Sequence, residues 1–319
     1  MIVFDDLHIS HREEALKHLS AWDLQGAENA FAGLYMWKDY FNTQIAFSGD
    51  FMYVKSSMPG RDCRFSIPKG NGDLKAAVQQ LIAMCTPFGA PNSKPFGSPN
   101  NEPNDSPNSG PNDSRFTLFL EEASKERLEQ LMPGVFTFEP IRAGFDYIYL
   151  TDDLVQLAGK KYHSKRNFVQ RFDREQEGRW EFKTITPEML PLIAEFNGNW
   201  YQTNTGGGAP EIKATANLFD NYTALECMGC ALFVDGQMVA YEVGSRINSD
   251  MVGVHIEKAN SAYVGAYQKI NHLFATHFCQ KFKYINREDD VGVEGLRKAK
   301  LSYHPYKLLS KYRANLAQI

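Results

Sequence analysis

Apolar residues along this chain alternate between strand-like and helix-like spacing, which indicates a mixed α and β protein. Before residue 134 the spacing predicts a helix over Leu74–Met84, a strand over Ser114–Leu120 and a short helix over Ser124–Met132. Pro133 and Gly134 end the last of these helices, because neither residue continues helical structure well. We place a domain boundary at this stop, which gives predicted domains of residues 1–134 and 135–319.

The second half opens with strand-like residues up to Leu150. Four predicted helices follow, over Thr151–Ala158, Tyr162–Glu177, Pro187–Tyr201 and Ala214–Leu225. Asp152 and Asp153 lie in the first turn of the first helix and Gly159 follows it, as the helix dipole and C-cap favour. The glycine-rich segment Asn204–Pro210 predicts a flexible loop between the third and fourth helices.

A β-hairpin is predicted next, because Asp235-Gly236 is a strong two-residue turn signal between two apolar runs. The remaining elements are a strand over Met251–Lys258, a long helix over Tyr263–Phe282, a short strand over Lys283–Asn286, a short helix from Glu294 and a final strand. Ligands in mixed sheets tend to bind at the carboxyl ends of strands, where the sheet splits or reverses. The charged loop after Ile285 lies at such an end.

Proline recurs at every fourth position from Pro87 to Pro111, within a segment rich in Asn, Ser, Gly and Asp that runs to Ser114. Proline removes a backbone donor and the other residues favour turns, so we predict an expanded surface loop over residues 87–114. A Pro-rich recognition segment is the alternative.

The composition is that of an ordinary globular protein, with 43% hydrophobic and 23% charged residues among 319. A net charge of -4 argues against a general nucleic-acid coat but leaves room for a local basic patch. No signal pattern or membrane-spanning run is present, so we predict a cytoplasmic protein. Neither a metal-ligand set nor a nucleotide-binding motif stands out, so we expect no metal and no tightly bound cofactor.

Basic residues crowd the start of the second predicted helix of this half. The group consists of Lys160, Lys161, His163, Lys165 and Arg166, followed by Asn167. A helix N-terminus is already the positive end of the helix dipole, so five basic groups there are unfavourable unless an anion binds. We therefore predict a phosphate site, with a solvated basic helix face as the alternative.

The loop from Asn286 to Pro305 is the second segment rich in functional side chains. We expect a general base among its acids, with Glu288 and Asp289 as candidates, and charge stabilisation by Arg287 and Lys300. Asn286, Arg297 and Tyr303 are added as substrate-binding candidates. The alternative is a salt-bridge loop that holds the last helix to the sheet.

Two long segments, Asp146–Phe172 and Tyr284–Tyr312, resemble the signature segments of a bacterial family grouped with the C-terminal domain of phosphatidylglycerol lysyltransferases. The resemblance implies an α+β fold of two tandem GNAT-like (GCN5-related acyltransferase) domains, similar to the Fem-type peptidyltransferases. Each domain would be a mixed, mostly antiparallel sheet flanked by helices. Lysyltransferases of this group move an aminoacyl group from aminoacyl-tRNA to a lipid headgroup, and they carry a lysine similar to Lys300 ahead of Tyr303 and Pro305.

The resemblance implies a soluble acyl- or aminoacyl-transferase that uses aminoacyl-tRNA or acyl-CoA as co-substrate. The acceptor would be an amine or hydroxyl of a small molecule, lipid headgroup or peptide, with transient contact to a membrane surface. Asn260–Gly265 retains one glycine of the pyrophosphate loop of ordinary GNAT enzymes, which favours aminoacyl-tRNA or another acyl donor over acetyl-CoA. A non-catalytic module that binds tRNA or another anion is the alternative.

Overall fold

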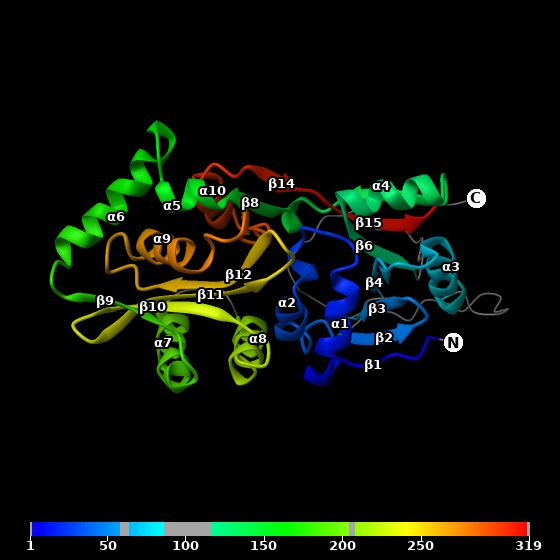
Figure 1. Cartoon of the computed structure of the whole chain (residues 1–319), viewed down its shortest axis with the longest axis horizontal. Coiled ribbons are helices and arrows are strands. Elements are labelled where there is room, and N and C mark those ends of the chain that lie inside the picture. The colour runs from blue at the N-terminus through cyan, green and yellow to red at the C-terminus, as the bar shows by residue number, and fades with distance from the viewer. Residues whose placement is uncertain (1, 58–63, 86–115, 204–207, 318–319) are drawn as a thin grey trace, which may run out of the picture.

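The computed structural model describes residues 2–57, 64–85, 116–203 and 208–317. The Pro/Asn repeat and part of the predicted loop at 204–210 lie outside these ranges. Two mixed sheets lie side by side along the long axis of the molecule, each with helices against it (Figure 1). The expected α+β class is thereby confirmed.

The first sheet has eight strands: β1 Asp5–Asp6, β2 Gln44–Ser48, β3 Phe51–Ser56, β4 Arg64–Ser66, β5 Lys69–Gly70, β6 Thr117–Glu121, β7 Phe136–Pro140 and β15 Lys311–Leu316. Their order is β1-β2-β3-β4-β6-β15-β7, with β5 on β3, and β4 and β6 run parallel while the other pairs are antiparallel. The α-helices of this half are α1 Arg12–Leu19, α2 Phe31–Met36, α3 Leu74–Cys85 and α4 Glu122–Leu131.

The second sheet has seven strands: β8 Asp146–Leu150, β9 Trp180–Thr184, β10 Met228–Val234, β11 Gln237–Arg246, β12 Met251–Ala259, β13 Tyr284–Asn286 and β14 Lys307–Leu309. Their order is β14-β8-β13-β12-β11-β10-β9, and β12 and β13 run parallel within an otherwise antiparallel arrangement. The predicted turn at Asp235-Gly236 joins β10 to β11, where both residues have positive φ.

Helices cover both faces of the second sheet. One face carries α5 Thr151–Gln156, α6 His163–Glu175 and α9 Ala266–Phe278, and the other carries α7 Leu190–Thr203 and α8 Ala209–Asp220 (Figure 1). The short helix α10 Glu294–Leu301 follows β13. Single 3-10 turns occupy Ile9–His11, Ala27–Asn29, Arg142–Gly144, Lys160–Tyr162 and Pro187–Met189.

The chain does not divide between the two sheets at residue 134. β7 follows that position but pairs with β15, and β15 returns from the far end of the chain to lie between β6 and β7. The division between sheets therefore falls after β7, and the last strand belongs to the first sheet. The predicted boundary differs from the observed one because the residue pattern of a strand does not determine which distant strand pairs with it.

The two halves share a hydrophobic core. Phe31, Tyr35 and Met36 of α2 pack in one cluster with Leu218 of α8 and Tyr241 of β11. Figure 1 shows α2 beside α8, between the two sheets. Burial of such a cluster is the main favourable term in folding, so the two halves stabilise one another.

Candidate functional site

The second sheet splits where β12 and β13 part. β13 pairs with β12 at Met251–Tyr284, Val252–Ile285 and Gly253–Asn286. β12 then continues to Ala259, whereas β13 ends at Asn286 and the residues after it leave the sheet. Ligands of such sheets bind outside the carboxyl ends of strands, where the order of strands changes. The predicted catalytic residues Arg287 to Asp289 therefore begin at a position suited to ligand binding.

Arg287 bridges the split by pairing with a carboxylate on β12. Its Nη2 donates to Oε2 of Glu257 at 2.5 Å, and its guanidinium lies 4.7 Å from the centre of the Tyr303 ring. Burial alone would lower the pKa of Arg287, but the Glu257 carboxylate raises it above its ordinary value, so the guanidinium stays charged. Its Nη1 atom is buried without a hydrogen-bond partner among the described residues.

Glu242 of β11 adds a second buried acid on this side of the split. Asn271 of α9 donates to its Oε1 at 3.5 Å, while Oε2 is buried and lacks a partner among the described residues. Burial raises the pKa of Glu242 well above its ordinary value, and the nearby Glu257 carboxylate acts in the same direction. Unpaired buried polar atoms together with displaced pKa values are more typical of a functional site than of a scaffold.

Glu288 turns the other way and contacts a histidine that the sequence analysis did not select. Oε1 of Glu288 lies 2.8 Å from Nδ1 of His255, and Nε2 of His255 lies 2.7 Å from Oγ of Ser245. The His255 side chain has 0% exposure, whereas Glu288 retains 26%. The available signal was three polar residues, His255, Glu257 and Lys258, inside an otherwise apolar strand.

Lys300 binds the backbone of the charged loop. Its ammonium donates to the carbonyl oxygen of Arg287 at 2.5 Å and to that of Asp289. Burial lowers the pKa of Lys300, and Arg287 adds to this effect. Burial raises the pKa of Asp289 to about 6, which is close to the range of a working acid or base. Lys300 thus holds the loop in which Asp289 and Glu288 lie.

Arg297 and Asn286 also hold the loop in place. Arg297 donates twice to Asp290, at 2.8 and 3.0 Å, and Tyr147 donates to the same fully buried carboxylate at 2.6 Å. Burial alone would raise the pKa of Asp290, but these hydrogen bonds bring it below its ordinary value. Asn286 donates to the carbonyl of Gln25 and to Asp146. For this part of the loop, these contacts match the alternative interpretation, in which a salt-bridge loop holds the last helix to the sheet.

The basic helix start is partly paired within the protein. Lys161 lies 2.9 Å from Asp153, and Arg166 donates to the backbone carbonyls of Leu157 and Gly159 at the end of α5. His163 contacts Asn167 at 3.4 Å. Lys160 and Lys161 are exposed, so these two ammonium groups face solvent at the start of the helix.

Lys165 is the buried member of this group. Its Nζ donates to Oγ of Ser302 at 2.6 Å and lies 4.0 Å from the centre of the Tyr303 ring. Burial lowers the pKa of Lys165 to about 8, and the nearby Arg287 charge acts in the same direction. Lys165 and Arg287 therefore contact the same buried aromatic ring.

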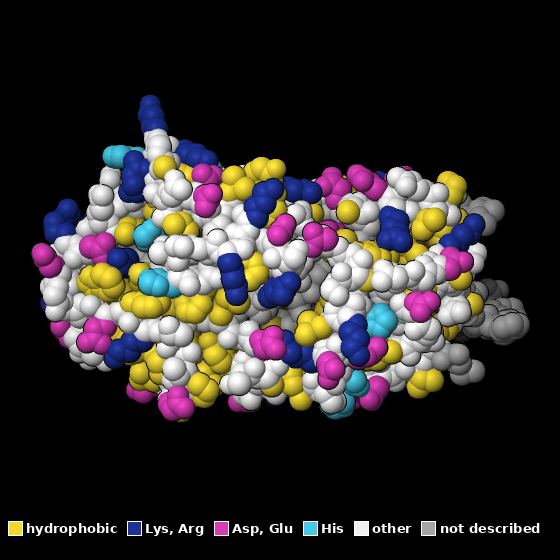
Figure 2. Space-filling view, viewed as in Figure 1, with side chains coloured by type: hydrophobic (Ala, Val, Ile, Leu, Met, Phe, Trp, Pro, Cys, Tyr) yellow, Lys and Arg dark blue, Asp and Glu magenta, His cyan; other side chains and the backbone are white. Residues whose placement is uncertain are grey.

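The two predicted segments meet. Besides the contacts at Ser302 and Tyr303, the His304 ring packs edge-on against Tyr162, and its Nε2 lies 3.1 Å from the carbonyl oxygen of Lys161. The start of α6 thus packs against the segment that follows α10. Figure 2 shows Lys and Arg side chains gathered over this end of the second half.

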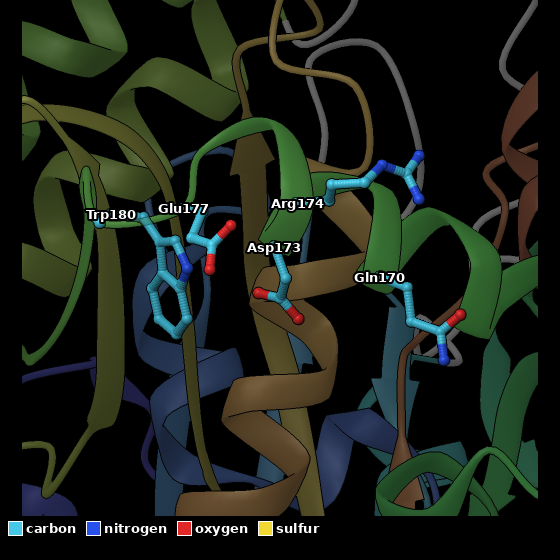
Figure 3. Close-up of a pocket in the computed structure, with 6 residues that line it drawn as sticks. Gln170, Asp173, Arg174, Glu177 and Trp180 are labelled. Carbon is cyan, nitrogen blue, oxygen red and sulfur yellow. The ribbon is translucent and has the colours of Figure 1, made fainter.

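A separate depression lies along the second half of α6. It is lined by Gln170, Asp173, Arg174, Glu177, Gly178 and Trp180. Figure 3 shows Asp173 and Arg174 between Gln170 on one side and Trp180 on the other. Asp173 pairs with Lys269 at 2.6 Å, and Lys269 lies 4.1 Å from the centre of the Trp180 ring. This depression is at the β9 edge of the sheet and contains none of the predicted site residues.

Among the described helices, none is both long enough and apolar enough to cross a lipid bilayer. Within the same residues, no group of three or more His, Cys, Asp or Glu side chains is arranged to hold a metal ion.

Comparison with known proteins identifies a family and a set of related folds. A sequence profile described as "Phosphatidylglycerol lysyltransferase, C-terminal" matches residues 112–315. A conserved protein of unknown function from Bacteroides thetaiotaomicron shares 33% sequence identity and a TM-score of 0.86, over 99% of this chain and 100% of that one. An uncharacterised protein of Mycoplasmoides gallisepticum is 25% identical over 52% of this chain, and the match spans only 54% of that protein.

More distant structures share the fold. L-PGS from Bacillus licheniformis is 14% identical with a TM-score of 0.62, over 95% of this chain and 91% of that one. FemX is 10% identical with a TM-score of 0.58, over 98% of this chain and 96% of that one. The expected α+β fold, with two mixed sheets flanked by helices, is confirmed, and L-PGS and FemX share it.

Proposed function

Because the chain belongs to the family of the phosphatidylglycerol lysyltransferase C-terminal domain, we propose that it transfers an acyl or aminoacyl group to an amine or hydroxyl at the split between β12 and β13. The observation that carries the proposal is the set of acids at the split, with Glu257 and Glu242 near Arg287 and Glu288 against His255. Nη1 of Arg287 and Oε2 of Glu242 are buried without hydrogen-bond partners among the described residues, which a purely structural group of ion pairs would not require.

In the proposed reaction, Glu288 is the general base. The acceptor's lone pair forms a bond to the acyl carbon, and the bond from that carbon to the donor oxygen or sulfur breaks with its electron pair on the leaving atom. The proton lost by the acceptor passes to Glu288 and then to the leaving atom. Arg287 stabilises the negative charge on the carbonyl oxygen, for which its buried Nη1 has a free N–H. Asp289 serves as a second acid near its pKa of about 6.

The donor we propose is aminoacyl-tRNA. Its phosphates would bind Lys160, Lys161 and His163. These side chains would be supported by the buried Lys165 and by Arg166 and Asn167. Acyl-CoA is less well suited, because α6 approaches the start of α9 closely. Gly265 at the N-terminus of α9 has a φ of 89°, and a side chain there would run into the carbonyl oxygen of Phe168 in α6. A carbonyl oxygen beside a helix N-terminus opposes the pyrophosphate binding that such a terminus otherwise favours.

The proposed acceptors are an amine or hydroxyl of a small molecule, a peptide or a lipid headgroup, the last reached by transient contact with a membrane surface. Aminoacyl-tRNA is a cytoplasmic donor, so we place the reaction in the cytoplasm.

Purified protein supplied with labelled aminoacyl-tRNA pools or with labelled acyl-CoA tests the proposal. We expect label to move from tRNA to an acceptor in a cell extract, and the double variant Lys160→Ala, Lys161→Ala to raise KM for tRNA. Lys298→Ala, another exposed lysine, is the matched control. Transfer from acyl-CoA with none from tRNA would overturn the donor assignment.

A non-catalytic tRNA- or anion-binding module is the second candidate. It is favoured by Lys300, Arg297 and Asn286, whose polar groups are engaged with the protein's own backbone and carboxylates. Binding that weakens steeply with salt, in the absence of any turnover, would support this candidate instead.

A further inference from the structure

Three side chains from three neighbouring segments form one hydrogen-bonded line. Ser245 is on β11, His255 is on β12 and Glu288 follows β13. The two links measure 2.7 and 2.8 Å. Ser245 is 4% exposed and the His255 side chain 0%, so the line meets solvent only at its Glu288 end.

The local backbone is shaped to form this line. The pairing of β12 with β11 shifts register around His255, because Val243 faces Ile256 while the next residue, Gly244, faces Val254. A bulge of this kind redirects the side chain of its extra residue. Glu288 has a φ of 58°, a left-handed conformation that costs a non-glycine residue free energy, and such strain concentrates at functional sites.

The imidazole ring of His255 lies close to two glycines. A Cβ on Gly253 would lie 3.4 Å from Cε1 of His255, and one on Gly33 of α2 would lie 3.6 Å from it. The ring is therefore enclosed by its own strand and by the first half of the chain. Both halves thus contribute to the position of His255.

The hydrogen bonds select one tautomer. A carboxylate accepts only, so Nδ1 of His255 must carry a proton toward Glu288. A neutral ring then has a bare Nε2, which accepts from the Ser245 hydroxyl. This arrangement pairs the three groups without placing a second charge in the buried part of the line.

We infer that His255 and Ser245 are positioning residues that hold the Glu288 carboxylate toward the acceptor. Oε1 of Glu288 is fixed by the N–H of His255, which leaves Oε2 to take the acceptor's proton. Ser245 in turn fixes the tautomer and the orientation of the ring. The inference rests on the proposed transfer reaction, in which Glu288 is the general base, and it adds two residues that do not touch the substrate.

A pair of substitutions separates positioning from structure. In His255→Asn the amide nitrogen falls near the place of Nδ1 and can still donate to Glu288. In His255→Gln the amide reaches toward Ser245 instead. Both remove the ring, so a purely structural role makes both variants equally poor. We expect kcat for aminoacyl-tRNA-dependent transfer to fall about 100-fold in His255→Gln and in His255→Ala, with KM for tRNA unchanged, and to be largely kept in His255→Asn.

Nuclear magnetic resonance of the protein labelled with ¹⁵N-histidine tests the same inference without any substrate. We expect the His255 signals of an Nδ1-protonated neutral ring, with an N–H that exchanges slowly with water, and loss of that slow exchange in Glu288→Ala. An Nε2-protonated ring, or equal transfer by the Asn and Gln variants, would overturn the inference. If the wild-type protein transfers no label, the proposed function fails, while the tautomer still decides whether Glu288 is held in this way.

Discussion

Two clusters of buried charge lie close together in this molecule, and they differ in how their charges are paired. At the junction between the sheets, Lys311 of β15 lies 2.7 Å from both Glu28 and Asp146. At the split between β12 and β13, Nη1 of Arg287 and Oε2 of Glu242 are buried without a hydrogen-bond partner among the described residues, whereas Oε2 of Glu28 at the junction, which also lacks one, is ion-paired with Lys311. At the junction, the charged groups join structural elements. At the split, Arg287 and Glu242 each retain a polar atom that could bind a ligand.

The surroundings of the two clusters show the same contrast. At the junction, Asp146 also accepts from the backbone N–H of Ala27 and from Asn286. Glu121 accepts from the N–H of Gly26 at 2.6 Å and from Asn29 at 3.1 Å. These contacts connect both halves of the chain and the returning strand β15. At the split, Glu288 faces a histidine and Glu257 faces an arginine, groups that can take part in proton transfer and charge stabilisation.

The largest effect we expect is at the junction. Lys311→Met would leave the buried Asp146 and the partly buried Glu28 without their cation and lower the free energy of unfolding by about 3–5 kcal/mol. Urea denaturation followed by circular dichroism measures this change. Lys307→Met is the matched control, since Lys307 is more exposed and its pair with Glu122 is 3.3 Å long. Equal effects of the two substitutions would remove the distinction between a joining charge and a surface charge.

A smaller loss of stability is expected from the contacts that hold the charged loop. Arg297→Met removes two hydrogen bonds to the fully buried Asp290, although Arg142 and Tyr147 remain, so we expect a cost of about 1–3 kcal/mol. The pKa of Asp290 is depressed in the folded state, so the stability it contributes is present above its unfolded pKa and is lost as pH falls through the folded value. The cost of Arg297→Met should therefore shrink in strong acid, as unfolding curves across pH would reveal.

Asp289 provides a test in the opposite direction. Its pKa of about 6 lies above the unfolded value of about 3.9, so the folded state binds the proton more tightly and loses stability as pH rises between these values. Asp289→Asn should raise the free energy of unfolding by about 1 kcal/mol at pH 8 and leave it nearly unchanged at pH 4. Thermal unfolding at the two pH values checks this. A stability loss at pH 8 would mean that the ionised Asp289 holds the fold together.

The order of elements could be predicted from the sequence because it depends on local spacing. The turn at Asp235-Gly236 and the charged loop at the end of β13 follow from residue types that favour them. The sequence does not show whether the basic helix start and the charged loop lie together, and the Lys165–Ser302 hydrogen bond joins them in the fold.

Other features depend on tertiary contacts that local spacing does not contain. The return of β15 to the first sheet required knowledge of which strands pair across nearly the whole chain. Lys300 donates to backbone carbonyls, and such partners cannot be predicted from a pattern of side chains. The side chain of His255 is directed by a bulge in the pairing of β12 with β11, which exists only in the folded chain.

The most direct test of this account compares Glu288→Gln with the wild-type protein in two assays on the same preparation, urea unfolding and transfer from labelled aminoacyl-tRNA. Glutamine keeps the size of the side chain but cannot accept a proton as a general base. We predict that transfer falls at least about 100-fold while the free energy of unfolding changes by less than about 1 kcal/mol. Unchanged transfer would show that Glu288 is not the general base. A loss of stability like that of Lys311→Met would show that the charge of Glu288 holds the fold together.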